Sequence, residues 1–377
     1  MRTDDVLESA CGAHAGGVAN RLSWEITMNR RDFLLASGSA ACMIGSARDG
    51  SARHASVARS EFCERLRPVG RILELDEWHV WGCSPIVGPD GRTHVFYSRW
   101  RGSFSNWLKT SEIAHAVATQ PEGPYQDLGV VLQGAGPGCW DADTMHNPTI
   151  HRIGNQYALF YISSNLAEAK RRGIHPAGSQ RIGLALAPSL DGPWKRVSGD
   201  RPILDIDPSA AAWDSFLTTN PAFMRHPNGE CWLYYKAWDR AHDNLRKMGL
   251  AIAAGIEGPY VRHAGNPIVS FAHLKREVED SYVWFEGGRF HMLMRDMGVV
   301  DPRVGLYMES DDGVEWSAPQ LGYESIDVYD AREPRTRFER PQVLLCNGKA
   351  THLFLALMGG KAGKSSGYVV RINETAD

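Results

Sequence analysis

Carboxylates, amides and an arginine recur where five similar apolar segments begin. The most acidic of these segments is Glu277-Val-Glu-Asp-Ser-Tyr-Val-Trp284. When the segments are aligned on the proline that most of them carry, one polar set lies one step before that position: Ser84, Asn147, Asn220, Asp280 and Arg340. A second set lies two steps before it: Cys83, His146, Thr219, Glu279 and Glu339. Polar groups beside such apolar strands are costly unless paired, so the clustering predicts a functional site.

The three acids in these sets fit the cleavage of a glycosidic bond. That reaction needs one carboxylic acid to protonate the leaving oxygen and one carboxylate to activate water or attack the sugar. Crowded acids acquire separated pKa values, and Arg340 could keep one of them ionised. We predict Glu279 and Glu339 as acid and base or nucleophile, with Asp280 in support. The alternative is a structural network of ion pairs.

A Trp-Asp pair occurs twice at the same place relative to an aligned asparagine. Trp140-Asp141 precedes Asn147 as Trp213-Asp214 precedes Asn220. Asp141 and Asp214 could support or replace the catalytic acids, with the tryptophans stacking on a sugar. They could equally clamp loops, with the carboxylates capping backbone N–H groups. The sequence leaves both interpretations open.

Other polar and aromatic residues could hold the substrate. His146 could bind hydroxyl groups, ligate a metal ion, act as an acid or form a simple hydrogen bond. The expected substrate-binding set is His146, Asn147, Asn220, Arg340, His79, Trp81, Trp140 and Trp213. We expect no required cofactor, although the centre of the molecule could hold calcium or another divalent ion.

These residues need a repeating scaffold to bring them together. Each opening segment continues through a Gly-containing turn into an aromatic strand, the usual hairpin signal. An Ala-rich strand and a Gly-Pro-aromatic turn follow, as in Ile182-Gly-Leu-Ala-Leu-Ala187 and Gly192-Pro-Trp194. The period of about 60 to 70 residues corresponds to four strands. We predict an all-β, five-bladed β-propeller with four-stranded antiparallel blades around an axial pocket, with the segment near 71–75 closing the last blade.

The composition is typical of a globular protein. The chain has 377 residues, a net charge of −3 and no cluster of basic residues, which argues against nucleic-acid binding. No apolar run is long enough to span a membrane. The five cysteines after residue 60 show no metal-binding spacing, so buried free thiols are expected. Oligomeric state stays open.

The first 60 residues differ from the rest. Arg30-Arg31 precedes an aliphatic and small-residue run, so residues 28–47 resemble a twin-arginine export signal. We therefore expect a leader and disordered segment over 1–60, a single propeller over 61–377, and a periplasmic or extracellular location. The alternative is a disordered tail with a chance Arg-Arg pair.

Residues 72–372 resemble the five-bladed glycoside hydrolases of families 43 and 117. The resemblance rests on the Asn-Pro and Arg-Pro openings, the Ala-rich third strands and the Gly-Pro-aromatic turns. It implies an exo-acting hydrolase that removes a terminal sugar from an oligo- or polysaccharide. Family 43 has its base where this chain has Ser84-Pro85 and its acid where this chain has Thr219-Asn220-Pro221, so the acids here lie in other blades. The alternatives are a non-catalytic carbohydrate-binding propeller and a propeller glycosyltransferase or phosphorylase.

Overall fold

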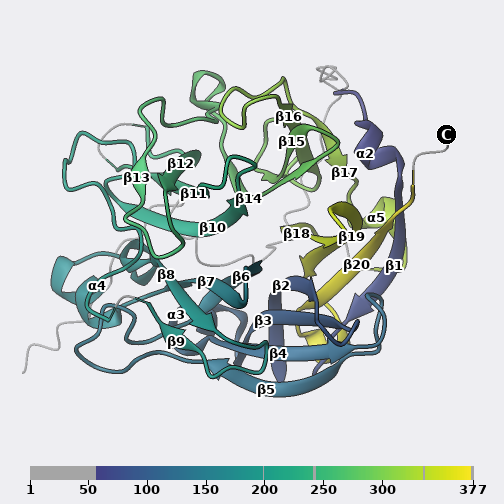
Figure 1. Ribbon diagram of the computed structural model, residues 1–377, viewed down its shortest axis with the longest axis horizontal. Helices are drawn as coiled ribbons and strands as arrows, with labels where there is room; N and C mark the ends of the chain where they lie inside the picture. Colours follow the sequence, from purple (N-terminus) through teal and green to yellow (C-terminus); the bar gives the residue numbers. More distant parts are fainter. Residues whose placement is uncertain (1–56, 198, 241–242, 334–335, 375–377) are drawn as a thin grey trace, which may run out of the picture. The chain divides into compact units, whose positions relative to one another are not determined.

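Five antiparallel sheets of four strands follow one another along the chain (Figure 1). The computed structural model describes residues 57–374 except 198, 241–242 and 334–335. The chain divides into two compact units, 1–46 and 47–377, and all described residues lie in the second. The predicted export signal therefore lies outside the described residues.

The blades follow the predicted order of strands. The first comprises β2 (Trp78–Val87), β3 (Thr93–Arg101), β4 (Glu112–Ala118) and β5 (Gln126–Leu132); the second β6 (His146–Ile153), β7 (Gln156–Ser163), β8 (Arg181–Ala187) and β9 (Lys195–Arg196); the third β10 (Leu217–Arg225), β11 (Cys231–Trp238), β12 (Lys247–Ala253) and β13 (Val261–Arg262); the fourth β14 (Val278–Glu286), β15 (Arg289–Asp296), β16 (Gly305–Ser310) and β17 (Gln320–Tyr323). The fifth comprises β18 (Phe338–Cys346), β19 (Lys349–Leu357), β20 (Ser366–Ile372) and β1 (Leu66–Ile72).

The fifth blade closes the propeller with strands from both ends of the domain. β1 pairs antiparallel with β20 as the outermost strand of that blade. The closing strand was predicted near 71–75 and lies a few residues earlier. In Figure 1 the dark strand β1 runs beside the yellow strand β20. The propeller is therefore closed by pairing between residues about 300 positions apart.

The five first strands are the innermost ones. β2, β6, β10, β14 and β18 each contact the next, and β18 contacts β2, which closes the ring. Apolar side chains fill the space between blades: Tyr282 and Leu293 of the fourth blade belong to one buried cluster with Leu353 and Tyr368 of the fifth. Short helices α2 (Glu61–Glu64), α3 (Trp107–Thr110), α4 (Leu166–Arg172) and α5 (Ile326–Tyr329) lie in the connections. None of the helices within the described residues could cross a membrane.

Every innermost strand carries the same bulge. Two residues of each strand are skipped in its pairing with the second strand, at 82–83, 147–148, 220–221, 280–281 and 340–341. The first residue of each pair is left-handed, with φ of 62° at Gly82, 49° at Asn147 and Asn220, 62° at Asp280 and 53° at Arg340. In three blades the second residue is proline, which suits a position without a ladder hydrogen bond.

This bulge corrects the sequence alignment of the first blade. Ser84-Pro85 was aligned with the other openings, but Pro85 pairs with Val95 beyond the bulge. Gly82 is the true counterpart of Asn147, and Trp81 is the counterpart of His146. Proline misled the alignment because it is tolerated at the bulge but is not required there.

All five described cysteines are free thiols. Cys63, Cys83 and Cys231 are buried, as expected, whereas Cys139 and Cys346 are partly exposed.

Candidate active site

The first residues of the bulges bond to one another around the centre of the propeller. Asn147 Nδ2 donates to Asn220 Oδ1 over 2.8 Å, and Asn220 Nδ2 donates to Asp280 Oδ1. The backbone N–H of Arg340 donates to Asp280 Oδ2 over 3.3 Å, and its Nη2 donates to the carbonyl of Asn147 over 3.4 Å. An added Cβ at Gly82 would lie 3.2 Å from Asn147 Oδ1. Four predicted site residues thus meet, with glycine leaving room in the fifth position.

The three acids also come together. Carboxylate oxygens of Glu279, Asp280 and Glu339 all lie within 4.8 Å of one another. Glu279 and Asp280 are buried, while the side chain of Glu339 keeps 15% of its exposure. The predicted grouping of acids from neighbouring blades is therefore present.

Cations that the sequence analysis did not identify surround these acids. Lys236 Nζ lies 2.7 Å from Glu279 Oε2, and Arg246 Nε lies 3.5 Å from the same oxygen. Arg295, the cross-strand neighbour of Glu279, bonds its Oε1 and lies 3.3 Å from Glu339 Oε2. We call the connected ion pairs of these residues the axial network: Glu277, Glu279, Asp280, Glu339, Lys236, Arg246, Arg295, Arg337 and Arg340.

The pairing register of the first and second strands identifies two of these cations. Thr219 pairs with Lys236 and Glu279 pairs with Arg295, so each cation faces the residue just before the bulge. Each also reaches the acid of the following blade: Lys236 contacts Glu279 and Arg295 contacts Glu339. Extending the repeat alignment into the second strands would have placed them at the site.

The network fixes the charge of Glu279. Burial alone would raise the pKa of its carboxyl group, but Lys236, Arg295 and Arg246 outweigh burial and hold that pKa well below its usual range. Burial likewise favours a lower pKa for Arg295, but Glu339, Glu279 and Asp280 raise it. Glu279 is therefore ionised at neutral pH and cannot serve as the resting proton donor.

Aromatic side chains form the other side of the site. Trp107 stacks on His146 with ring centroids 4.7 Å apart, and Trp100 meets the same ring edge-on at 5.4 Å. Trp81 packs against Phe104 at 5.3 Å. We call these five side chains, all from the first two blades, the aromatic wall.

His146 is neutral and its tautomer follows from its partner. Burial, then Arg340 and Lys236, hold its pKa well below the usual value. The Ser111 hydroxyl donates to the Met145 carbonyl over 2.8 Å, so it accepts from His146 Nδ1, also at 2.8 Å. His146 Nε2 is then an unprotonated acceptor, which suits binding a hydroxyl and excludes a role as resting acid.

His79 uses both ring nitrogens within the protein. Its Nδ1 accepts from the backbone N–H of Ser365 over 3.1 Å, and its Nε2 lies 3.3 Å from the Gly102 carbonyl. It also stacks on Trp100 at 5.3 Å. His79 therefore supports the aromatic wall. This position corrects the prediction that His79 binds the substrate directly.

The two Trp-Asp pairs lie against outer strands. Asp141 Oδ2 accepts from Tyr161 OH over 3.0 Å and from Arg196 of the outermost strand β9 over 2.8 Å. Trp140 stacks on the same tyrosine at 6.2 Å. Because Asp141 is 1% exposed and bonded to both Tyr161 and Arg196, it clamps the loop onto the blade.

The third blade repeats this arrangement. Asp214 Oδ2 accepts from Tyr235 OH over 2.9 Å and from Arg262 of β13 over 2.6 Å, and Trp213 stacks on Tyr235 at 5.7 Å. Trp284 of the fourth blade is likewise buried, against Phe62 and Tyr307. We therefore remove Asp141, Asp214 and their tryptophans from the candidate site.

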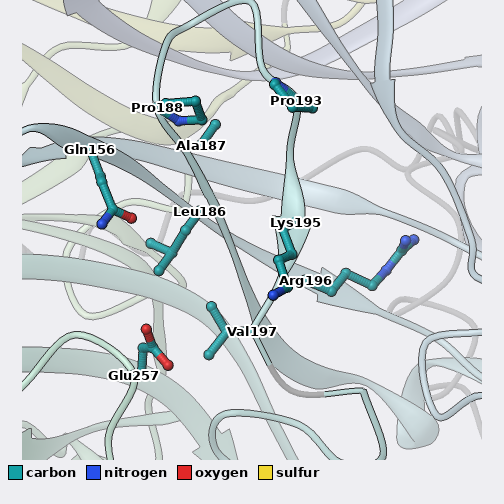
Figure 2. Close-up of a pocket in the computed structure, with 9 residues that line it drawn as sticks. All are labelled: Gln156, Leu186, Ala187, Pro188, Pro193, Lys195, Arg196, Val197 and Glu257. Atoms are coloured by element: carbon teal, nitrogen blue, oxygen red, sulfur yellow. The ribbon is translucent and has the colours of Figure 1, made fainter.

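A cavity elsewhere in the domain is lined by none of the residues of the axial network. Figure 2 shows it between the second and third blades, lined by Leu186, Lys195, Arg196 and Glu257 among others. Its lining comes from β7, β8 and β9 and from the turns beside them, and none of it comes from an innermost strand. It adds no acid pair suited to glycoside cleavage.

The grouping of Glu279, Asp280 and Glu339 would resemble a metal site if its surroundings were ignored. Lys236 and Arg295 already neutralise Glu279, and Asp280 accepts hydrogen bonds from Asn220 and Arg340. A divalent cation would have to displace these groups. The residues present do not fit the axial calcium ion that the sequence analysis allowed.

Comparison with known proteins gives the fold. No protein-family model and no curated protein sequence matches the chain. Zg3597, a family 117 glycoside hydrolase from Zobellia galactanivorans, is similar over 83% of this chain and 92% of its own, with 16% identity and a TM-score of 0.62. A family 43 β-xylosidase/α-arabinofuranosidase from a compost metagenome, CoXyl43, is similar over 83% and 96%, with 16% identity and a TM-score of 0.55. A family 43 enzyme from Xanthomonas citri covers 82% and 92%, with 17% identity and a TM-score of 0.56. The predicted five-bladed fold and its resemblance to these two families are confirmed.

Proposed function

We propose that this propeller, which shares its fold with family 117 and family 43 glycoside hydrolases, is itself a glycoside hydrolase. The observation that carries the proposal is the meeting of Glu279, Asp280 and Glu339 within 4.8 Å at the starts of neighbouring inner strands. Paired carboxylates are what glycosidic cleavage requires. In the aromatic wall beside them, Phe104 and Trp107 are partly exposed and offer apolar faces for a sugar ring.

The charge state of Glu279 decides which acid takes which catalytic role. Glu279 is held ionised and is the nucleophile in this proposal, so the role of acid goes to Glu339, the most exposed of the three. Attack of Glu279 on the anomeric carbon breaks the glycosidic bond as Glu339 gives its proton to the leaving oxygen. Water, deprotonated by Glu339, then releases the sugar and frees Glu279.

The spacing supports retention of configuration. Retaining enzymes hold their carboxyl groups about 5–5.5 Å apart, whereas inverting ones leave about 6.5–9.5 Å for a water molecule. One oxygen of Glu279 lies within 4.8 Å of one oxygen of Glu339, which favours the shorter class because it leaves little room for a water molecule between the two groups. Proton NMR of the first product formed should show the substrate's anomeric configuration, and the opposite anomer would contradict Glu279 as nucleophile.

Exo-action and export are further parts of the proposal. The bonded ring of Asn147, Asn220, Asp280 and Arg340 supports a site closed at its base, which would accept a chain end. Arg30-Arg31 supports twin-arginine export to the periplasm or beyond. Sequencing the N-terminus of the fractionated native protein tests export: a mature protein beginning after residue 47 is expected.

Two matched substitutions test the activity. Glu279→Gln and Glu339→Gln should each lower hydrolysis of aryl glycosides and oligosaccharides by about 10²- to 10⁴-fold. Glu122→Gln is the control, because Glu122 is also paired with an arginine, Arg371, but in a turn outside the axial network. Folded Gln variants with full activity would refute the assignment.

One observation favours a second function, non-catalytic carbohydrate binding. Both oxygens of Glu279 are already engaged by Lys236 and Arg295, which weakens it as a nucleophile. A binding protein would show saturable glycan binding without turnover, in contrast to the hydrolase.

A further inference from the structure

The axial network contains more positive than negative side chains. Its five cations, Lys236 and four arginines, face four acidic side chains, and the fifth cation, Arg337, has a side chain that is 37% exposed. Lys236, Arg246, Arg295 and Arg340 are each less than 9% exposed and lie among these four acids. A ligand is therefore indicated by unpaired hydrogen-bond donors in the network and not by its net charge.

Two buried guanidinium groups also have unused donors. Arg295 Nε, Arg340 Nε and Arg340 Nη1 have no hydrogen-bond partner among the described residues. Arg340 Nη1 lies 3.9 Å from Asp280 Oδ1, too far for a hydrogen bond. Leaving a buried donor unpaired is costly, so these three N–H groups call for acceptors from outside the protein.

The surroundings of Arg340 agree with this. Burial lowers its pKa, and Asp280 and Glu279 raise it without restoring the usual value. The arginines of the Trp-Asp clamps provide a contrast: Arg196 bonds Asp141 and the Gln133 carbonyl, and Arg262 bonds Asp214 and the Asp205 carbonyl. Those arginines each bond a carboxylate and a backbone carbonyl, whereas Arg295 and Arg340 keep buried N–H groups without partners among the described residues.

We propose that the axial site binds a sugar that carries a carboxylate, a uronic acid, with the acid group held by Arg295 and Arg340. A carboxylate supplies paired acceptors that match the planar guanidinium group. The sugar ring would lie against the aromatic wall, where Trp107 stacks on His146. This assignment rests on the proposed function, because it names the substrate class of the same site.

Calorimetric titration of the full protein tests the assignment without turnover. Glucuronate and galacturonate are each compared with their methyl esters, which keep the shape of the sugar and remove the charge. The acids should bind at least about tenfold more tightly, with a preference that weakens as salt rises. Equal affinity for acid and ester, tighter binding of the ester, or no binding of either at millimolar concentration would overturn the proposal.

Inorganic phosphate separates a sugar site from a simple anion site. If phosphate binds as tightly as the uronates and displaces them, the sugar contributes nothing and the proposal fails. Weak phosphate binding with tight uronate binding supports it.

Two variants locate the binding. Arg295→Lys keeps the charge and loses the planar fork, and Arg340→Met removes the charge; each should reduce the preference for acid over ester to about twofold or less. Arg196→Lys, a fully partnered arginine on β9, should leave the preference unchanged. Circular dichroism confirms folding, and if Arg340→Met does not fold, Arg295→Lys alone decides: an undiminished preference in that variant would overturn the proposal.

Hydrolysis is assayed separately so that the two proposals can fail separately. Turnover of neutral aryl glycosides without preference for aryl uronides would overturn the uronic acid assignment and leave the hydrolase. Tight uronate binding without turnover of any glycoside would overturn the hydrolase and leave the uronic acid site.

Discussion

The molecule contains two kinds of buried acid that look alike in sequence. Asp141 and Asp214 each accept from one tyrosine and one arginine, and that arginine also bonds a backbone carbonyl. Glu279 instead meets Lys236, Arg246 and Arg295, in a network where Arg295 and Arg340 keep buried N–H groups without partners among the described residues. The arginines of the clamps are engaged within the protein, whereas those of the network have donors left for a ligand. Buried acids therefore indicate function where the surrounding groups are unmatched, and indicate stability where they are matched.

Arg295→Met should cause the largest loss in the free energy of unfolding. The substitution leaves Glu279 and Glu339 without the cation that joins them, and removing one partner from buried ion pairs costs about 3–5 kcal/mol. Urea unfolding of the variant and the wild type measures the difference. A loss below about 1 kcal/mol would mean that Lys236, Arg246 and Arg337 compensate these acids without Arg295.

Asp214→Asn should lower stability and leave activity intact. The amide oxygen can still accept from Tyr235 and Arg262, which both bond Oδ2, but the amide lacks the negative charge that pairs with partly buried Arg262, so we expect a loss of about 1–3 kcal/mol. Hydrolysis per folded molecule should stay within about twofold of the wild type, measured below the unfolding temperature. Asp141→Asn is the matched replicate in the second blade. Activity lost in both variants, without loss of stability, would restore these acids to the catalytic set.

The fold could be predicted from the sequence because it depends on local patterns repeated five times. Hairpin turns such as Gly287-Gly288 and the Ala-rich third strands specify each blade without long-range information. The candidate acids followed from the same repeat, since Glu279 and Glu339 occupy equivalent register positions.

The partners of those acids could not be predicted from this pattern alone. Arg246 reaches Glu279 from the loop before the third strand of the preceding blade, a contact that depends on how blades pack. Likewise, Arg196 reaches Asp141 from 55 residues away, so the clamp was indistinguishable from a catalytic acid. Sequence periodicity places residues within a blade, whereas charge matching is decided between blades.

Burial and two cations of the axial network should also affect the pH dependence of stability through His146. Its pKa is depressed in the folded protein by burial and by Arg340 and Lys236, so the unfolded chain binds the proton more readily. Stability should therefore be highest above about pH 6.5 and fall as pH decreases, by up to about 1.4 kcal/mol per pH unit for this group. His146→Gln should flatten the slope between about pH 6.5 and 4.5, where Glu279 stays ionised. An unchanged slope would assign the acid sensitivity to other buried histidines such as His115, whose pKa is lowered to about 4.

The smallest expected effect tests whether the ring of bulges positions the axial network. Gly82 and Gly154 are both left-handed, with φ of 62° and 56°, so alanine should cost about 1–2 kcal/mol at either position. Only at Gly82 would the new Cβ approach a neighbour, Asn147 Oδ1 at 3.2 Å, because nothing lies within 4 Å at Gly154. Gly82→Ala should therefore cost about 1 kcal/mol more than Gly154→Ala in urea unfolding, and it alone should reduce hydrolysis, since Asn147 bonds Asn220 and through it Asp280. If the two variants have equal stability and equal activity, the ring yields to the added methyl group, and the site is positioned by the ion pairs of the fourth and fifth blades without help from the first.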